Sequence, residues 1–166
     1  EFYVAVSVED NGEAKLVAKV EEITSKKPLP QGETGILFQN VFTPDPVDVV
    51  IDGTKAMSGR DLTAEEFTFE LYETGADFAL AEDARPKDTA VNDADGAFGF
   101  DKFSLSQVGS YHYVVKEKIG TAARVTYDTT VYHVTVTVTN EDGVLKAETA
   151  YKVGGASKNE IAFHNS

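Results

Sequence analysis

The stretch GSYHYVVKEK, residues 109–118, decides the class of the fold. Tyr111, Tyr113 and Val115 stand two residues apart, and side chains two apart share one face of a β-strand. The same alternation places Glu117 on that apolar face. This strand is therefore expected to carry one carboxyl group into the protein core.

Two further stretches repeat this pattern with different polar groups. The amine of Lys55 is in phase with the apolar residues of 47–51, and the carboxamide of Asn165 is in phase with those of 161–163. Burying an amine, a carboxyl or an amide without a partner costs roughly 2–7 kcal/mol, and more if the group stays charged. We therefore interpret Lys55, Glu117 and Asn165 as partners of one another.

These three side chains form a reactive set. Desolvation disfavours charged forms, so a buried lysine tends toward the neutral amine and a buried glutamate toward the protonated acid. A neutral lysine is a nucleophile, and its target would be the side-chain carbonyl of Asn165. Glu117 would donate a hydrogen bond that polarises this carbonyl and then pass protons to the leaving ammonia. The expected product is an isopeptide bond between Lys55 and Asn165.

A simpler arrangement is also compatible with the pattern. Lys55 and Glu117 could form a buried salt bridge while Asn165 caps a backbone group. A bulge at Gly53 could also turn Lys55 outward. Strand periodicity alone does not separate these arrangements from the reactive set.

Five segments between Val47 and Asn165 resemble a known family. They are GTKAMSGRDLTAEEFTFELYETG (53–75), NDADGAFGF (92–100), GSYHYVVKEK (109–118), VTYDTTVYHVTVTVTNEDGVLKAE (125–148) and IAFHN (161–165). Together they are similar to the isopeptide-bonded pilin domain of Gram-positive bacteria, of the streptococcal T-antigen type. In that family the lysine lies on the first strand, the glutamate in a Y-x-Y-x-V-x-E strand and the asparagine in a terminal F-x-N. These positions fall on Lys55, Glu117 and Asn165.

The resemblance implies a structural subunit of a Gram-positive pilus or fibrillar adhesin, stabilised by an autocatalytic crosslink. It further implies an extracellular fibre attached to the cell wall, with neighbouring pilin subunits as partners. Because the crosslinking is one intramolecular event, we expect a structural protein and not an enzyme with turnover. The alternative function is an adhesin module that binds a host glycan or matrix protein through loops such as residues 73–96.

The composition favours an all-β protein. The chain has 166 residues, 42% of them hydrophobic, with ten Phe, seven Tyr and a single Met. Aromatic and β-branched residues are enriched in strands. Short strands separated by turns predict an immunoglobulin-like β-sandwich with an intramolecular Lys-Asn isopeptide bond. The expected strands are 47–55, 67–71, 97–103, 110–117, 129–138, 144–151 and 160–165.

Charge and motifs exclude several other classes. The net charge of −13 would repel nucleic acid. No apolar run reaches the length of a membrane-spanning helix, and the absence of cysteine excludes disulfides. The turn at 92–96 lacks the first and twelfth ligands of a calcium loop. His112, His133 and His164 are out of phase with the apolar faces, so we expect them to face solvent, and we expect neither a metal nor a cofactor.

An internal repeat indicates a second, partial domain. The alternation of residues 2–8 repeats that of 132–138, and each runs into an Asn-Gly or Asp-Gly hairpin signal. The segment 36–40 matches 161–165, which makes Asn40 a second candidate acceptor of an isopeptide bond. No lysine before Asn40 occupies the first-strand position of the family.

The repeat predicts the following domain organisation. Residues 1–42 would be the C-terminal strands of a preceding, incomplete pilin-type domain, and 47–166 would be the complete isopeptide-bonded domain. Residues 43–46, TPDP, would be a short, stiff linker. Half a domain would leave sheet edges and apolar area uncovered, so we expect a complementary chain or a neighbouring subunit to pair with residues 1–42. Because the chain opens inside a strand pattern, we expect it to be a piece of a longer protein.

Overall fold

The computed structural model describes residues 2–10, 12, 16–25 and 42–166. The chain divides into two compact units, Glu1–Phe42 and Thr43–Ser166. Every regular secondary-structure element assigned within the described residues is a β-strand. The all-β class expected from composition and periodicity is therefore confirmed.

The first unit contains a β-hairpin of β1 (Phe2–Asp10) and β2 (Leu16–Ser25), paired antiparallel. Val4, Val6 and Val8 alternate along β1, and each is at least 44% exposed. Their direct partners on β2 are also apolar, so one face of the hairpin is hydrophobic. Among the described residues of the first unit, no further strand or helix covers this face.

Asn40 lies outside the described residues. Its role as a second acceptor therefore stays a prediction, as does the assignment of residues 1–42 to a preceding domain.

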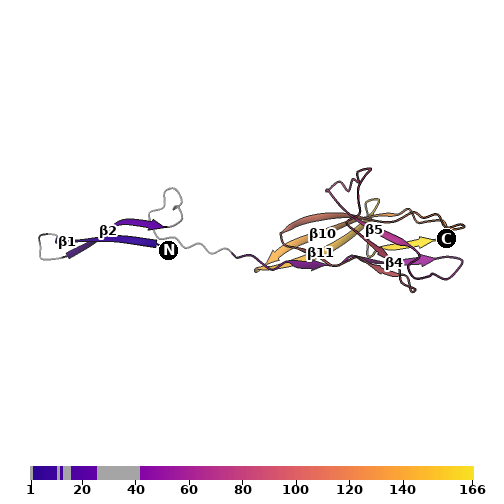
Figure 1. Cartoon of the computed structure of the whole chain (residues 1–166), viewed down its shortest axis with the longest axis horizontal. Helices are drawn as coiled ribbons and strands as arrows, with labels where there is room; N and C mark the ends of the chain where they lie inside the picture. Colours follow the sequence, from indigo (N-terminus) through magenta and orange to yellow (C-terminus); the bar gives the residue numbers. More distant parts are fainter. Residues whose placement is uncertain (1, 11, 13–15, 26–41) are drawn as a thin grey trace. The chain divides into compact units, whose positions relative to one another are not determined.

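The second unit is built from two layers of strands. Its strands are β3 (Val47–Val49), β4 (Asp52–Met57), β5 (Thr68–Thr74), β6 (Asp88–Val91), β7 (Ala97–Gly99), β8 (Phe103–Leu105), β9 (Gly109–Glu117), β10 (Val131–Glu141), β11 (Val144–Val153), β12 (Ala156–Lys158) and β13 (Ala162–Asn165). One layer is a six-stranded sheet in the order β12-β11-β10-β9-β5-β6. Its strands β5, β10 and β11 are labelled in Figure 1. The other consists of the sheets β13-β4-β7 and β3-β8.

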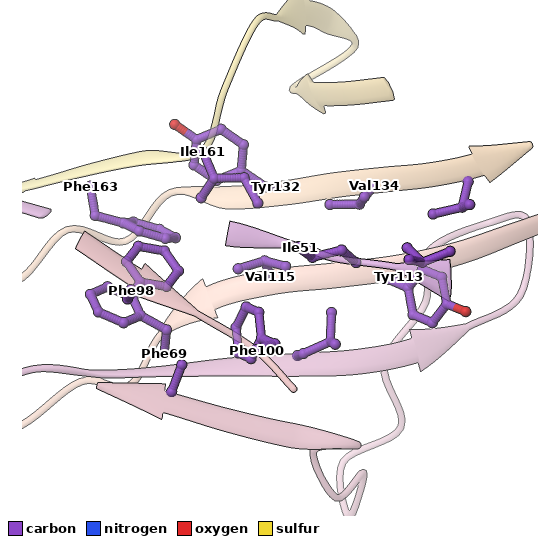
Figure 2. Close-up of a cluster of buried hydrophobic side chains, with 14 of the residues drawn as sticks. Ile51, Phe69, Phe98, Phe100, Tyr113, Val115, Tyr132, Val134, Ile161 and Phe163 are labelled. Atoms are coloured by element: carbon purple, nitrogen blue, oxygen red, sulfur yellow. The ribbon is translucent and has the colours of Figure 1, made fainter. Parts of the chain in front are cut away.

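The inward faces of the two layers meet in one core. Phe69 on the six-stranded sheet stacks on Phe98 and Phe163 of the opposite layer, with ring centroids 3.7 and 5.3 Å apart (Figure 2). Tyr113 and Val115 of β9 are both at most 1% exposed, as their phase predicts. This packing of two strand layers on one core is the predicted immunoglobulin-like sandwich.

The first expected strand, 47–55, is divided in the structure. β3 pairs with β8, whereas β4 pairs with β13 and β7. The alternation nevertheless continues across the break, because Val49, Ile51 and Lys55 are all buried. Gly53 does not turn Lys55 outward. A Cβ at this glycine would lie 2.6 Å from the ring of Phe98. Only glycine therefore lets the backbone of β4 lie this close to the ring.

The last strand of the sandwich lies beside β4, the second part of the expected first strand. β13 pairs with β4 in parallel, and Phe163 is opposite Lys55. The backbone N–H of Thr54 donates to the carbonyl oxygen of Ile161, and that of Ser58 donates to the carbonyl oxygen of Asn165, both at 2.9 Å. The side chains at positions 55 and 165 are thereby brought to neighbouring strands of one sheet.

The turn at residues 92–97 supports β4 from the other side. The backbone N–H of Lys55 donates to the carbonyl oxygen of Gly96 at 2.7 Å. The Asp93 carboxylate accepts hydrogen bonds from the backbone N–H groups of Asp95 and Ala97. The acidic residues that resemble part of a calcium loop thus close a local turn.

Gly96→Ala is expected to destabilise the sandwich much more than Gly59→Ala. Both glycines have positive φ, +92° and +83°, which costs an L-residue about 1–2 kcal/mol. A Cβ at Gly96 would also lie 2.1 Å from the carbonyl oxygen of Lys55, whereas a Cβ at Gly59 meets open space. We expect about 1–3 kcal/mol of additional loss at Gly96, measured as the free energy of unfolding in urea. Equal losses for the two variants would contradict this close approach.

Candidate functional site

Three strands from both layers bring Lys55, Glu117 and Asn165 together. Lys55 lies on β4, Glu117 at the end of β9 and Asn165 at the end of β13. The Lys55 Nζ donates to Glu117 Oε2 at 2.8 Å, and the Asn165 Nδ2 donates to Glu117 Oε1 at 2.7 Å. One carboxyl group therefore bridges the amine and the carboxamide.

The cluster is closed off from solvent. The side chains of Lys55 and Glu117 have no exposed area, and Asn165 is fully buried. The ring of Phe67 lies 4.8 Å from the Lys55 Nζ and forms an apolar wall beside it. With water excluded, each polar group depends on the others for its hydrogen bonds.

Burial makes the amine of Lys55 easier to deprotonate than an exposed lysine. Loss of hydration lowers the Lys55 pKa, and this is the largest influence on it. The hydrogen bond and the charge of Glu117 act in the opposite direction, but the Lys55 pKa stays below its usual value. Burial thus makes the neutral form of the amine, which is the nucleophilic form, easier to reach than in an exposed lysine.

The carboxamide of Asn165 has a fixed orientation. Its Oδ1 accepts a hydrogen bond of 2.7 Å from the backbone N–H of Asp128. In the flipped amide, the NH₂ group would face this N–H, and two donors would oppose each other. The nitrogen of Asn165 therefore faces Glu117 and the oxygen faces Asp128.

This orientation differs from the sequence-based expectation. We expected Glu117 to donate to the carbonyl oxygen of Asn165, but its two oxygens contact the Lys55 amine and the Asn165 nitrogen. The role of Asp128 is not visible in the sequence. The pattern Asp128-Thr129-Thr130 predicts a local turn cap, and nothing in it points to a strand more than 30 residues away.

The salt-bridge arrangement and the reactive set share the contact between Lys55 and Glu117. The hydrogen bond from the Asp128 backbone N–H to Asn165 Oδ1 is the backbone cap that the salt-bridge arrangement includes. A structural salt bridge does not require the second hydrogen bond, from Asn165 Nδ2 to Glu117 Oε1. This second bond places the acid between the Lys55 nitrogen and the Asn165 nitrogen. It is the contact that a proton shuttle needs.

The histidines lie elsewhere in the sandwich. His112 and His133 are on the outer face of the six-stranded sheet, as their phase predicts, but they are half-buried. The ring of Phe78 stacks on His133 with centroids 4.3 Å apart and meets His112 edge-on at 5.2 Å. These two side chains face outward as expected but are only partly exposed, because Phe78 of the loop after β5 packs on them. His164 is exposed, as expected.

Two other kinds of feature are missing from the described part of the chain. It contains no cluster of three or more His, Cys, Asp or Glu side chains that could hold a metal ion. It also contains no helix with the length and apolar character needed to span a membrane.

Comparison with solved structures finds streptococcal pilins of similar fold. The major pilin T-13 of Streptococcus pyogenes is 20% identical, with a TM-score of 0.50, and the match covers 75% of this chain and 54% of that one. The T3.2 pilin of the same species is 19% identical (TM-score 0.48, 76% and 54% covered). A further S. pyogenes major pilin is 18% identical (TM-score 0.47, 73% and 50% covered). The chain thus spans about half the length of these pilins.

Comparison of sequences assigns the family. A search of curated proteins finds no significant match. The sequence profile of FctA, described as a Spy0128-like isopeptide containing domain, matches residues 51–166. This match covers most of the chain and includes Lys55, Glu117 and Asn165, in agreement with the family resemblance noted from the sequence. The chain therefore belongs to the FctA family of Spy0128-like isopeptide-containing domains.

Proposed function

We propose that this chain is a structural element of a Gram-positive surface pilus and that an autocatalytic bond between Lys55 and Asn165 stabilises it. Membership of the isopeptide-domain family supports the first part. The observation that carries the second part is the bridging position of Glu117 between the Lys55 amine and the Asn165 carboxamide. The protein would act outside the cell, in a fibre attached to the wall, with neighbouring pilin subunits as partners.

The proposed reaction exchanges one amide nitrogen for another. The neutral Lys55 Nζ adds to Cγ of Asn165, and the added nitrogen gives a proton to Glu117 Oε2. Glu117 enters the reaction as the protonated acid. After the addition, Asn165 Nδ2 is no longer conjugated with the carbonyl and accepts this proton from Glu117, and the bond from Cγ to Nδ2 breaks. The products are an isopeptide bond, one ammonia and Glu117 in its starting protonation state. Because the reaction consumes its own side chains, it takes place once per molecule.

The position of the bond suits a load-bearing role. β4 and β13 are adjacent and parallel, so a pull on Thr43 and Ser166 shears one strand along the other. A covalent link between Lys55 and Asn165 would carry this load directly. The strands between them in sequence would then bear little of the tension.

The first unit supports the proposed assembly with a partner chain. Its described hairpin exposes an apolar face, and such a face is expected to be covered in an assembled protein. We propose that a complementary chain or neighbouring subunit pairs with residues 1–42.

The adhesin alternative has less support in the loop that would serve it. Phe78 lies within residues 73–96, and Tyr72 directly precedes them. Tyr72 is 6% exposed and donates to Glu70, and Phe78 packs on His133. Both rings are thus occupied by contacts within the sandwich, and neither is presented for stacking on a sugar.

The intact mass of the denatured protein is expected to be one ammonia below the mass of its sequence. Glu117→Gln, which preserves shape but cannot shuttle a proton, should keep the full sequence mass, as should Lys55→Met. The exposed Lys102 pairs with Asp48 on the surface, so Lys102→Gln is a control that should retain the deficit. A full sequence mass for the unmodified chain would refute the crosslink.

The crosslink is also expected to raise thermal stability and resistance to trypsin. In the chain-entropy model, closing a loop of about 100 residues stabilises by about 4–5 kcal/mol. Such a gain raises the melting temperature by about 10 °C or more for a domain of this size. Lys55→Met and Glu117→Gln should both lose this increment, measured by calorimetry and by the half-life in trypsin. Because they leave different polar groups unpaired, only a loss common to both reports the bond itself.

Lys55→Met and Glu117→Gln could instead match the unmodified chain in melting temperature and trypsin half-life. That result would contradict the mechanical function, even if the unmodified chain shows the mass deficit.

A further inference from the structure

The carbonyl oxygen of Asn165 faces a backbone donor and not an acid. The backbone nitrogen of Asp128 lies 2.7 Å from Asn165 Oδ1 and donates its hydrogen to it. Both oxygens of Glu117 are engaged elsewhere, on the Lys55 amine and on the Asn165 nitrogen. The group placed to respond to charge on the carbonyl oxygen is therefore the backbone of Asp128.

The Asp128 carboxylate holds this N–H in place. Its Oδ1 accepts from the backbone N–H of Thr130, and its Oδ2 accepts from the backbone N–H of His164, both at 2.8 Å. The second bond joins the loop directly to β13, one residue before Asn165. Burial would raise the Asp128 pKa, but these hydrogen bonds keep it below its usual value, so the carboxylate stays an acceptor.

A second pair of contacts fixes the same segment from its other end. The backbones of Thr126 and Ser166 exchange hydrogen bonds in both directions, at 2.6 and 3.2 Å. Residues 126–128 thus run along residues 164–166 with anchors on both sides of the Asp128 N–H. A donor held in this way does not have to reorganise when charge appears in front of it.

Charge appears on this oxygen when the proposed crosslink forms. As the Lys55 nitrogen adds to Cγ of Asn165, the carbonyl electrons move onto Oδ1, and they return when the bond to Nδ2 breaks. A pre-oriented N–H within about 2.7–3.1 Å of such an oxyanion typically contributes a factor of about 10² to 10³ in rate. Protons move only through Glu117, so the Asp128 N–H stays intact throughout.

We propose that the backbone N–H of Asp128 is the oxyanion donor of the crosslinking reaction and that the Asp128 carboxylate positions it. This inference rests on the proposed function, because it assigns a part of the same reaction. It also gives the N–H a second task, which is to keep the Asn165 nitrogen turned toward Glu117.

The direct test removes one backbone N–H and keeps the side chain. The full chain is assembled under denaturing conditions with the α-hydroxy analogue of aspartate at position 128, so that an ester oxygen replaces the N–H. Dilution into folding buffer sets zero time, and the loss of ammonia is followed by intact mass. We expect the crosslinking rate to fall by about 10² to 10³-fold relative to the unmodified chain.

Asp101 provides a matched control. Its backbone N–H donates to Asp88 Oδ2, also at 2.7 Å, and Asp88 is not bonded to Lys55, Glu117 or Asn165. The same ester at position 101 removes a comparable hydrogen bond and is expected to leave the crosslinking rate unchanged. The rate difference between the two esters therefore reports the reaction and not the general cost of a lost hydrogen bond.

A comparison of two side-chain variants provides a second test, which does not require the ester-containing chains to fold. Asp128→Asn keeps the N–H, but its side chain can no longer accept both backbone donors. Asp88 also accepts two backbone N–H groups, those of Thr89 and Asp101, so Asp88→Asn is its counterpart. We expect crosslinking to slow by about 10-fold or more in Asp128→Asn, because the donor is misplaced, and to be unchanged in Asp88→Asn.

Each outcome distinguishes this inference from the function on which it rests. If the unmodified chain never loses ammonia, the proposed function fails and the inference fails with it. If the unmodified chain crosslinks and the variants at Asp128 react as fast as their counterparts at Asp101 and Asp88, only the oxyanion role of Asp128 is overturned.

Discussion

The exclusion of water from one amine, one acid and one amide is the constraint on which the rest of this structure depends. Lys55, Glu117 and Asn165 are buried too deeply for solvent to satisfy them, so each must find its hydrogen bonds in the other two or in nearby backbone. This requirement fixes the positions of β4, β9 and β13 relative to one another. The same lack of water lowers the pKa of Lys55, which makes the neutral amine easier to reach. The structural role of the cluster and its proposed chemical role thus have a single physical origin.

The parts of this site that could be predicted from sequence follow from local periodicity. A strand buries alternate residues, so Tyr113 and Val115 fix the inward direction of Glu117, and the same rule places Lys55. The rule held across the break between β3 and β4, because the chain changed its sheet partners without losing its alternation. Phe78 shows the limit of the rule: phase gave the correct sheet face for His133, but not that a distant ring would cover it.

Asp128 could not have been found in this way, because its contribution is a backbone group. The N–H of any residue except proline could serve as the donor, so the sequence carries no specific signal for it. What selects position 128 is the side chain, which ties the loop to His164 and Thr130. In this account, the tie spans two segments more than 30 residues apart and becomes visible only when both lie in the folded sandwich.

We propose that the Lys55 nitrogen and the Asn165 side-chain carbon are covalently joined in the mature protein. A high-resolution crystal structure of the purified chain tests it most directly. If the crosslink forms, continuous density is expected between Lys55 Nζ and Asn165 Cγ at an amide bond length of about 1.33 Å, with the Asp128 N–H on the carbonyl oxygen. Separate side chains at a non-bonded distance of about 3 Å or more, with the Asn165 nitrogen still present, would contradict it.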